Sequence, residues 1–395
     1  MINLYKIKDI GNFFGGLTGK SKEDFNIGNA KFVSYMTVFS NPQLPDSIND
    51  TVLISENEKQ NKIKKGDILF TGSSETPDEC GMSCVVTQDI DDDIYLNSFC
   101  FGLRLNNKEI ANPAYLSHYF RSNYARKQIK KTANGVTRFN ISKKKFSEIE
   151  IVIPPIKVQE EIVKILDSFT NLIDALNEEL LLRQKQFEYY REKLLTFDDN
   201  VYLMRLGDCC VIKGRIGFRG YTIKDQVNKG EGAISLSPGN ISEGIINYNQ
   251  CTYISWDKYY ESPEIMINNG DIIFCKTGST VGKVTVVEKL PCEATINPQL
   301  VVLKEININK KYLYYYLSSN RIQNKVKSLA GVGSVPNISQ SILNDLDISV
   351  PSSQVMKSIV EKLDAFESLI SSLKEEIALR QKQYEYYREK LLTFD

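Results

Sequence analysis

The stretch LRQKQFEYYREKLLTFD, residues 182–198, determines how this chain is organised, because it occurs twice. It returns 197 positions later as LRQKQYEYYREKLLTFD, residues 379–395, and the two copies differ only where Phe187 is replaced by Tyr384. Self-similarity at a fixed distance is the mark of a duplicated unit. The sequence therefore predicts that the 395-residue chain contains two related halves.

Weaker similarities extend the duplication toward the N-terminus. Asn-Ile-Ser at residues 140–142 returns at residues 337–339, at the same distance. Further upstream, Gly-Asp-Ile-Leu-Phe begins at Gly66, and a similar segment, Gly-Asp-Ile-Ile-Phe, begins at Gly270. Each half is therefore expected to be a divergent globular part followed by a nearly invariant helix.

Each repeated segment belongs to a longer heptad pattern. Apolar residues recur at alternating steps of four and three over residues 162–197 and 359–394, which is typical of a coiled coil. At 1.5 Å per residue, each pattern would form a helix roughly 54 Å long. One polar residue interrupts each pattern, Arg183 and Arg380, which would either set the register of the pair or contact a partner. The residues predicted to pair the helices are Ile162, Leu166, Phe169, Ile173, Leu176 and Leu180 in the first copy, and Ile359, Leu363, Phe366, Ile370, Leu373 and Ile377 in the second.

The parts between the repeated helices are expected to be α+β globules. Turn-forming residues lead into the apolar, β-branched runs after Gly66 and Gly270, which predicts a strand in each half. Asn112, which is followed by proline, predicts the N-cap of one helix running to about residue 132. Asn309 predicts its counterpart, running to about residue 329.

These patterns divide the chain into four parts. Residues 1–153 and 199–350 are the two globules, and residues 154–198 and 351–395 are the two helical segments. At about 150 residues per domain, the length agrees with two or three domains.

Composition limits the class of protein further. Hydrophobic residues make up 42% and charged residues 25% of the chain, which is ordinary for a globular protein and excludes a mostly disordered one. No apolar run reaches the roughly 18 residues of a membrane span, and the N-terminus does not resemble a signal peptide. We therefore expect a cytoplasmic protein that does not contact membranes and whose eight cysteines are reduced.

Motifs for catalysis and metal binding are incomplete. The single histidine, His118, excludes multi-histidine metal sites and lies in an amphipathic stretch, where a packing or surface role is expected. The segment GGLTGKS, residues 15–21, is one residue short of a phosphate-binding loop, and Cys80 and Cys84 lack the second pair that a zinc site needs. We expect no metal, no cofactor and no catalytic residue in this chain.

The balance of 49 basic and 49 acidic residues conceals an uneven distribution. Residues 121–145 carry nine Lys or Arg and no acid, and the glycine-containing stretch KGRIGFRGYTIK, residues 213–224, also has no acid. Glycine lets the backbone approach a phosphate, and the cations neutralise it. The predicted DNA-binding residues are Lys20, Lys22, Arg138, Lys143, Lys144 and Lys145 in the first globule, and Arg215, Arg219 and Lys224 in the second. Most should contact phosphates, and at most a few should read guanine edges; for Arg138, a surface salt bridge is the alternative.

These features together resemble the specificity subunit of type I restriction-modification systems, and the resemblance covers the whole chain. In that family the turn into the first conserved helix reads Pro-Pro-x-x-x-Gln-x-x-Ile, which here is PPIKVQEEI, residues 154–162. The Gly-Asp-Ile strands and the Asn-Ile-Ser segments also match the family pattern. The second junction departs from it, because Ser352 and Met356 replace proline and glutamine.

The resemblance implies a subunit that is not itself an enzyme. Each globule would be a target recognition domain that reads one half of an asymmetric, bipartite sequence in double-stranded DNA. The two helices would form an antiparallel pair that fixes the spacing, giving the fold an internal pseudo-two-fold repeat. Two modification subunits, which methylate adenine with S-adenosylmethionine, would dock on its two similar faces, and restriction subunits, which use ATP and Mg²⁺, can join them. A helix of roughly 54 Å exceeds the 34 to 36 Å of one DNA turn, so two domains at its ends could address separate half-sites.

Two other classes of function stay open. A coiled-coil assembly protein without DNA recognition would make the acid-free stretches incidental. A self-contained methyltransferase or nuclease is less favoured, because no cofactor or metal motif was found. Methyl transfer by the purified chain alone would support the enzyme, and failure to bind DNA even with the modification subunit would support the assembly protein.

Overall fold

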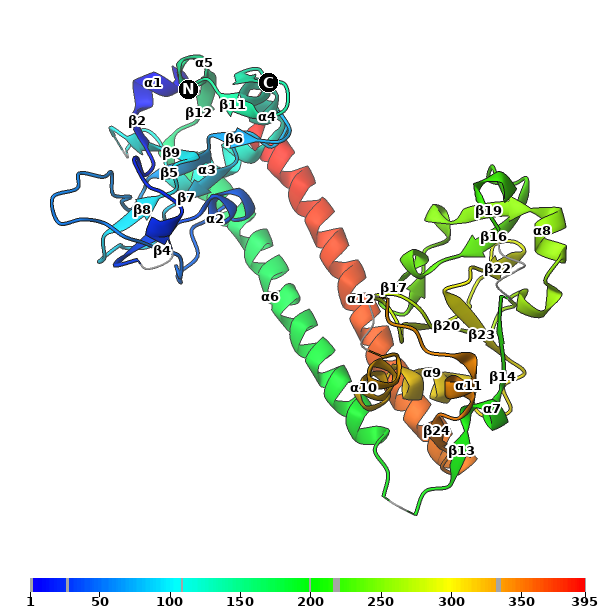
Figure 1. The fold of residues 1–395 in the computed structure, drawn as a ribbon. Coiled ribbons are helices and arrows are strands. Elements are labelled where there is room, and N and C mark those ends of the chain that lie inside the picture. Colours follow the sequence, from blue (N-terminus) through cyan, green and yellow to red (C-terminus); the bar gives the residue numbers. More distant parts are fainter. Residues whose placement is uncertain are drawn as a thin grey trace. The chain divides into compact units, whose positions relative to one another are not determined.

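The computed structural model describes residues 3–25, 28–107, 109–198, 200–215, 221–331 and 335–394. The chain divides into two compact units, which Figure 1 shows in ribbon form. Unit 1 comprises Met1–Glu178 together with Glu375–Asp395, and unit 2 comprises Glu179–Lys374. Two long helices, α6 (Ile156–Leu194) and α12 (Ser353–Leu392), each contribute to both units, so the repeated segments are helical in the structure.

Unit 1 is a mixed α/β globule built on small sheets. An antiparallel four-stranded sheet has the order β2 (Gly11–Gly15), β9 (Cys100–Leu105), β5 (Ile68–Thr71), β7 (Ser83–Val85). A second sheet has the order β4 (Thr51–Val52), β3 (Ala30–Val33), β8 (Ile94–Leu96), and its last pair is parallel. Smaller sheets pair β1 (Asn3–Lys6) with β12 (Glu150–Ile153), and place β11 (Phe139–Ile141) between β10 (Ala133–Asn134) and β6 (Ser73–Ser74). The short helices are α1 (Ile7–Ile10), α2 (Tyr35–Ser40), α3 (Pro113–Arg121), α4 (Asn123–Lys130), α5 (Lys143–Ser147) and the 3-10 turn η1 (Glu23–Phe25).

Unit 2 repeats this plan. Its antiparallel sheet has the order β14 (Val211–Gly214), β23 (Leu300–Lys304), β20 (Ile272–Cys275), β21 (Val284–Val286). The next sheet has the order β15 (Gln226–Val227), β19 (Thr252–Ser255), β16 (Gly232–Leu236), β22 (Ala294–Ile296), again with a parallel last pair. Two further pairs are β13 (Leu203–Arg205) with β24 (Asp347–Ser349), and β17 (Ile241–Ser242) with β18 (Ile245–Ile246). The short helices are α7 (Leu206–Cys209), α8 (Trp256–Tyr260), α9 (Lys310–Ser318), α10 (Asn320–Leu329) and α11 (Gln340–Asn344), with 3-10 turns η3 (Ile223–Asp225), η4 (Pro238–Asn240), η5 (Tyr248–Gln250) and η6 (Pro263–Ile265).

The predicted strands after Gly66 and Gly270 are the central strands β5 and β20, whose residues are all buried. Both glycines have positive φ, 91° and 89°, which a side chain would strain. The Asp67 carboxylate accepts from the amide of Lys64 at 2.7 Å and closes the turn that starts β5. Sequence pattern and structure agree here because turn chemistry and burial specify the same element.

The prediction of one continuous helix after Asn112 is wrong. Asn112 does cap α3, accepting from Ala114 N at 2.9 Å, but the helix ends at Arg121. Ser122 has an extended backbone, and its hydroxyl accepts from Ala125 N to start α4. Ser319 separates α9 from α10 in unit 2 in the same way. A serine that satisfies the free amides of a new helix is a stable break in the chain.

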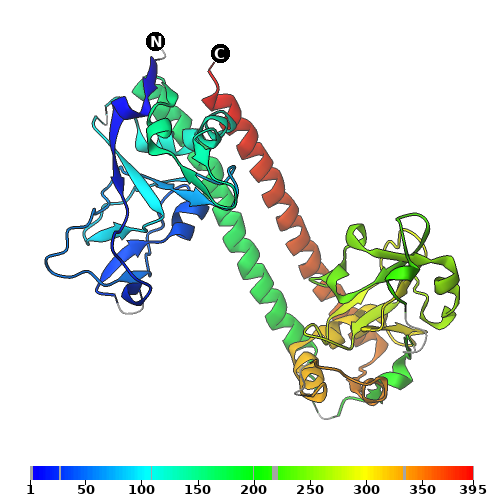
Figure 2. The ribbon, with the colours of Figure 1, turned by 45° about the horizontal axis from the view of Figure 1, so that its top comes forward.

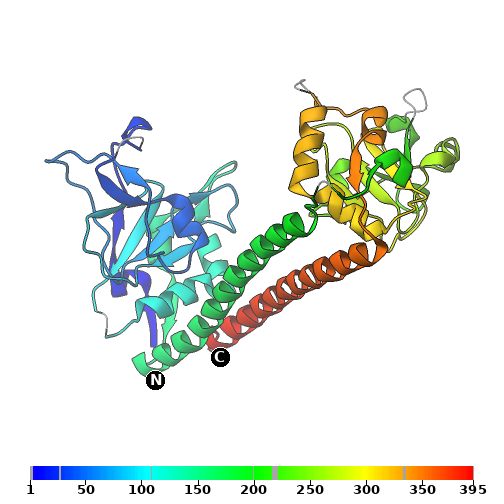
Figure 3. The same ribbon diagram turned by 90° about the horizontal axis from the view of Figure 1, so that it is seen from below.

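Each long helix shares a hydrophobic core with its own globule. In unit 1, Ile162 and Leu166 of α6 belong to one buried cluster with Tyr115 of α3 and with Tyr384 and Leu392 of α12. Figure 2 shows the strands of unit 1, blue to cyan, beside the start of α6. In unit 2 the corresponding cluster contains Ile359 and Leu363 of α12 and Leu195, which follows α6. Figure 3 shows α9 and α10, in yellow and orange, beside the end of α6. Among the described residues, no helix combines the length and the apolar character that crossing a membrane would need.

Candidate nucleic-acid interface

The nine cations of residues 121–145 divide into internal and external groups. Arg121 donates through Nε to Ser83 O at 2.7 Å and through Nη2 to Asn41 O at 3.0 Å, and burial lowers its pKa. Arg126 donates through Nη1 to Gly81 O at 2.7 Å, and burial lowers its pKa to about 10. Both arginines therefore hold the loops of the globule together, and the charge available for a ligand lies further along the chain.

The external group is concentrated on α5. Lys143, Lys144 and Lys145 form its first turn and are exposed, and the Ser142 hydroxyl caps the helix by accepting from Lys145 N. Cations at a helix N-terminus oppose the helix dipole, so helix stability does not explain these three residues. Among the described residues, none of the three forms an ion pair, although Lys145 Nζ donates to Asn134 Oδ1 at 3.3 Å. The three ammonium groups are thus available to an anion.

Arg138 lies in the turn between β10 and β11, where it is exposed. Its guanidinium carbon lies 4.8 Å from the centre of the Phe99 ring, and Phe99 is itself 52% exposed. Gly135, with φ of 144°, lies in this turn. Glycine is needed there, because a Cβ would lie 2.0 Å from Arg138 O. The described part of the chain offers Arg138 a cation–π contact and no ion pair, so the alternative of a surface salt bridge finds no support.

Lys20 and Lys22 occupy different environments. The Lys20 side chain is 8% exposed, and its Nζ lies 2.5 Å from Glu58 Oε2 and donates to Leu53 O at 2.6 Å. The hydrogen bond from Lys20 is the largest cause that lowers the pKa of Glu58 to about 2. Lys22 is exposed. The predicted DNA contact of Lys20 stays a prediction, but its charge is already neutralised within the globule, whereas that of Lys22 is accessible.

The predicted residues of the second globule that the structure describes occupy different environments. Arg215 is 5% exposed; its Nε donates to Ile296 O at 3.2 Å, its guanidinium lies 5.3 Å from the Tyr221 ring, and burial lowers its pKa. Lys224 is exposed in η3. Arg219 lies outside the described residues. Of the two predicted residues that the structure describes here, Arg215 is therefore internal and Lys224 is accessible.

The residues predicted to pair the helices fall into two groups. Some are buried: Ile162, Leu166, Ile173, Ile359 and Leu363, which belong to the cores that the helices share with the globules, and Leu373. The others are half-buried: Phe169, Leu176, Leu180, Phe366, Ile370 and Ile377. Two of these make aromatic stacks on the other helix, Phe169 on Tyr387 in unit 1 and Phe366 on Tyr190 in unit 2, both with ring centres 5.4 Å apart.

The junctions between globule and helix differ chemically. In unit 1, buried Gln159 donates through Nε2 to Ile110 O at 2.9 Å and to Pro154 O at 2.7 Å, and accepts from Asn112 N at 2.8 Å. In unit 2 the same position is Met356, which is 6% exposed and belongs to the hydrophobic core. The departure from the Pro-Pro-Gln pattern therefore replaces hydrogen bonds by apolar packing at a position that stays internal.

The one difference between the repeated segments also has a structural partner. His118 is 2% exposed, its Nε2 lies 2.8 Å from Asp167 Oδ1, and its Nδ1 lies 3.2 Å from the Tyr384 hydroxyl. In unit 2, Tyr315 takes the place of His118 and donates to Asp364 Oδ1 at 2.7 Å, and it faces the ring of Phe187. Tyr384 thus supplies a hydroxyl to His118 in unit 1, whereas Phe187 faces Tyr315, which already has a partner in unit 2. The buried site of His118 agrees with its predicted packing role.

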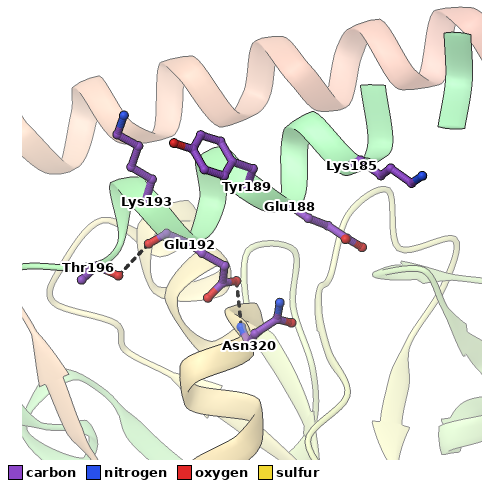
Figure 4. A pocket seen from close by; sticks show the side chains of 7 residues that line it. All are labelled: Lys185, Glu188, Tyr189, Glu192, Lys193, Thr196 and Asn320. Atoms are coloured by element: carbon purple, nitrogen blue, oxygen red, sulfur yellow. Dashed lines mark hydrogen bonds between the residues drawn. The ribbon is translucent and has the colours of Figure 1, made fainter. Parts of the chain in front are cut away.

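An open groove of about 620 Å³ lies on the repeated helix segment in unit 2 (Figure 4). It is lined by Lys185, Glu188, Tyr189, Glu192, Lys193, Thr196 and Asn320. Glu192 accepts from the amide of Asn320, the first residue of α10, at 2.8 Å. Tyr189 is 60% exposed, with Lys193 Nζ 5.7 Å from its ring centre.

Unit 1 carries the same groove residues on α12 and α4. Glu389 accepts from the amide of Asn123 at 2.8 Å, and Tyr386 is 60% exposed with Lys390 Nζ 5.9 Å from its ring centre. Sequence reasoning missed these surfaces. The available signal was the distance of 197 residues between Asn123 and Asn320, which equals the distance between the repeated helices.

The described residues contain no group of three His, Cys, Asp or Glu side chains that could hold a metal ion. Cys84 is a buried free thiol whose pKa is raised by burial to about 12, as expected for a structural cysteine.

Comparison with known proteins gives the family. A family model described as the type I restriction modification DNA specificity domain matches residues 2–182 and again residues 199–379. The EcoR124I/EcoR124II specificity subunit of Escherichia coli is 34% identical over 245 residues, which are 60% of this chain and 59% of that protein. A Haemophilus influenzae protein named as a candidate type I restriction enzyme specificity subunit is 32% identical over 309 residues, 73% of this chain and 74% of that protein.

Solved structures share the fold. The S subunit of a type I restriction-modification system from M. genitalium has a TM-score of 0.56 at 16% identity, covering 100% of this chain and 97% of that one. A chain of another type I system has a TM-score of 0.62 at 16% identity, covering 100% of this chain and 98% of its own. The duplicated match and the repeated topology lead to one conclusion. The chain belongs to the type I restriction-modification DNA specificity family and is a non-catalytic specificity subunit.

Proposed function

We propose that the two globules are target recognition domains, residues 1–153 and 199–350, and that each reads one half of a bipartite, asymmetric target in double-stranded DNA. The observation that carries this proposal is that the two globules are built on similar sheets but expose different charges. The two globules share the strand order of their four-stranded antiparallel sheet, and the second sheet of each contains one parallel pair. Their exposed charges differ, because three lysines begin α5 whereas Gln340 begins α11.

In the first globule, the exposed cations of α5 and Arg138 are the expected DNA-facing residues. The three lysines suit phosphate contacts, since an ammonium group carries little sequence information there. Each phosphate contact should contribute about 0.9 to the slope of log K against log salt concentration. In the second globule, Lys224 is the exposed cation among the predicted residues that the structure describes.

The helices are proposed to form an antiparallel coiled coil that sets the distance between the half-sites. The stack of Phe169 on Tyr387 and that of Phe366 on Tyr190 fit one antiparallel register, since moving toward the C-terminus on α6 corresponds to moving toward the N-terminus on α12. A helix of 39 residues is about 58 Å long, which is more than the 34 to 36 Å of one DNA turn.

The repeated groove is proposed as the docking surface for two modification subunits, one on each copy. The residues that line it in unit 2 recur in unit 1, and an exposed tyrosine with a lysine over its ring is a suitable interface anchor. S-adenosylmethionine, ATP and Mg²⁺ would then be bound by modification and restriction subunits, in a complex that acts on DNA in the cytoplasm.

Selection from random DNA tests this function. The purified chain, together with its modification subunits, should enrich one asymmetric motif with two defined parts and an undefined spacer from a pool of random duplexes. Enrichment of no sequence would contradict the proposal and favour the assembly protein. Methyl transfer by the purified chain alone would favour the self-contained enzyme.

A further inference from the structure

The end of the central strand in unit 1 is tied to two other segments by backbone hydrogen bonds. Gly72 lies between β5 and β6, and its amide donates to Phe99 O at 2.7 Å, in the turn before β9. Ile141, the last residue of β11, donates its amide to Gly72 O at 2.8 Å. Three segments far apart in the sequence therefore meet at one point, near β6 and β11 in Figure 1.

Unit 2 contains the same arrangement. The amide of Lys276, directly after β20, donates to Gln299 O at 2.9 Å, and Ile338 N donates to Lys276 O at 2.9 Å. We call this three-segment meeting point the strand-end site of each unit. The two units share the backbone hydrogen bonds of this site but differ in its side chains.

The turn within each strand-end site is fixed by an asparagine. Phe99 N donates to Asn97 Oδ1 at 2.9 Å in unit 1, and Gln299 N donates to Asn297 Oδ1 at 3.0 Å in unit 2. Such Asx turns hold the following residue in place independently of its side chain. The scaffold can therefore accept different residues at Phe99 and Gln299 without a change of backbone.

The side chains at equivalent positions differ in chemistry. The pairs that differ are Gly72 and Lys276, Ser73 and Thr277, Phe99 and Gln299, and Arg138 and Val335, whereas Asn140 matches Asn337. Phe99, Gln299, Arg138 and Val335 are exposed, Lys276 and Thr277 are half-buried, and Ser73 is buried. Variation of accessible side chains on a fixed scaffold is expected where each copy contacts a different ligand.

In unit 1 the strand-end site presents a guanidinium over an aromatic ring. Arg138 lies 4.8 Å from the ring centre of Phe99, and both side chains are exposed. The ring orients the guanidinium by cation–π attraction, and an oriented guanidinium can donate two hydrogen bonds to O6 and N7 of guanine. The exposed edge of Phe99 suits contact with a thymine methyl group.

In unit 2 the site presents amides and an ammonium group. Asn297 Nδ2 donates to Gln299 Oε1 at 3.1 Å, and Thr277 Oγ1 donates to Asn337 Oδ1 at 2.6 Å. These bonds orient the side-chain amides of Gln299 and Asn337. The NH₂ groups of these two amides have no acceptor among the described residues. Within the same part of the chain, the half-buried Lys276 side chain forms no ion pair. Amides and ammonium groups read the major-groove edges of adenine and guanine.

We propose that the strand-end sites are where the two globules read bases: Arg138 with Phe99 in unit 1, and Lys276 with Gln299 in unit 2. This inference rests on the proposed function and deepens it, because it names the residues that set each half of the target. It also moves base reading in unit 2 away from the stretch of residues 213–224. That stretch keeps exposed Lys224 for phosphate contact.

Adenine methylation read by long-read sequencing tests the inference in the parent strain with single chromosomal substitutions. Gln299→Ala and Lys276→Ala should change the required bases in one half of the motif, and Arg138→Ala and Phe99→Ala in the other half. For each affected base, the preference over alternatives should fall on the order of 10-fold or more. The second half and the spacer length should be unchanged in each case.

Gln299→Glu serves as an isosteric variant, because the exposed side chain keeps its size while its donor becomes an acceptor. It should shift the base preference and preserve methylation. Lys327→Ala, an exposed lysine on α10, is the matched control and should leave the motif unchanged.

An unchanged motif in the strand-end variants would overturn the inference, and so would an equal loss at all sites, which identifies a phosphate contact. Either result leaves the proposed function intact, provided that the wild-type strain shows a two-part motif that depends on this chain. Absence of such a motif in the wild type would contradict the proposed function itself.

Discussion

The hydroxyl of Tyr384 should stabilise unit 1, whereas the equivalent residue of unit 2, Phe187, has no hydroxyl. Tyr384→Phe removes the group that lies 3.2 Å from His118 Nδ1, in a site where the two residues are 5% and 2% exposed. A buried polar atom left without a partner costs about 1–3 kcal/mol. This cost corresponds to a roughly 5- to 160-fold larger equilibrium constant for opening of α3, which carries His118.

Native-state hydrogen exchange on the full chain measures this opening locally, which suits a protein of two units. The matched variant is Phe187→Tyr, the reciprocal change in unit 2. Tyr315 already donates to Asp364 there, so no existing polar atom loses its partner, and the free energy of opening of α9 should change by no more than about 0.5 kcal/mol.

The double variant His118→Tyr with Tyr384→Phe supplies a rescue. It places in unit 1 the residue pair that unit 2 uses, Tyr315 with Phe187, beside Asp167 instead of Asp364. Most of the lost protection should return, since the new hydroxyl can donate to Asp167. Unchanged exchange of α3 in Tyr384→Phe, or an equal effect of Phe187→Tyr in unit 2, would refute the reasoning.

Four further results are expected. Tyr189→Ala and Tyr386→Ala should each remove one modification subunit from the complex, as measured by native mass spectrometry; retention of both in the double variant would contradict docking at the grooves. Replacing Lys143–Lys145 by alanine should weaken binding equally on all DNA sequences and reduce the salt slope by about 0.9 per lost phosphate contact; a changed sequence preference at constant slope would argue against phosphate contacts. Ser122→Ala should cost about 1 kcal/mol of stability in urea unfolding through the lost cap, whereas an unchanged midpoint would mean that the cap contributes nothing. Because the pKa of Glu58 is lowered to about 2, its ion pair with Lys20 should contribute its full stability above pH 4.5, the ordinary pKa of the group. This contribution should be lost as the pH falls toward 2; an NMR titration of Glu58 with an ordinary midpoint would contradict this.

Much of the fold could be predicted from sequence because its signals are local. The repeated segments are helical, Asn112 and Asn309 cap helices, and turns at Gly66 and Gly270 lead into buried strands. Each of these features depends on residues within a few positions of one another. Helix periodicity, cap chemistry and positive φ at glycine then suffice to place the element.

The environment of individual charges could not be predicted in the same way. Lys20 is neutralised by Glu58, 38 positions away, and Arg215 donates to a carbonyl at Ile296, 81 positions away. An acid-free stretch shows only that no partner lies nearby in the sequence. The break at Ser122 was missed for another reason, since helical periodicity continues across it while a single hydroxyl decides the boundary.

The strand-end sites become apparent only when the structures of the two units are compared. Gly72 and Lys276 have no chemistry in common, and the segments that follow them differ in length before the next strand. The offset that relates Gly66 to Gly270 also relates Gly72 to Lys276, and the matching hydrogen bonds then identify Phe99 and Gln299 as equivalent positions. Duplication within one chain therefore supplied a comparison between a conserved scaffold and a divergent surface.

The central claim is that this chain selects the DNA sequence that its partners modify. Genome-wide adenine methylation, read by long-read sequencing in the parent strain and in a strain lacking this gene, tests it most directly. Loss of one asymmetric, two-part motif in the deletion strain, and its return when the gene is restored, is the predicted result. A two-part motif that persists unchanged without the gene, while the modification subunits are expressed, would contradict the account.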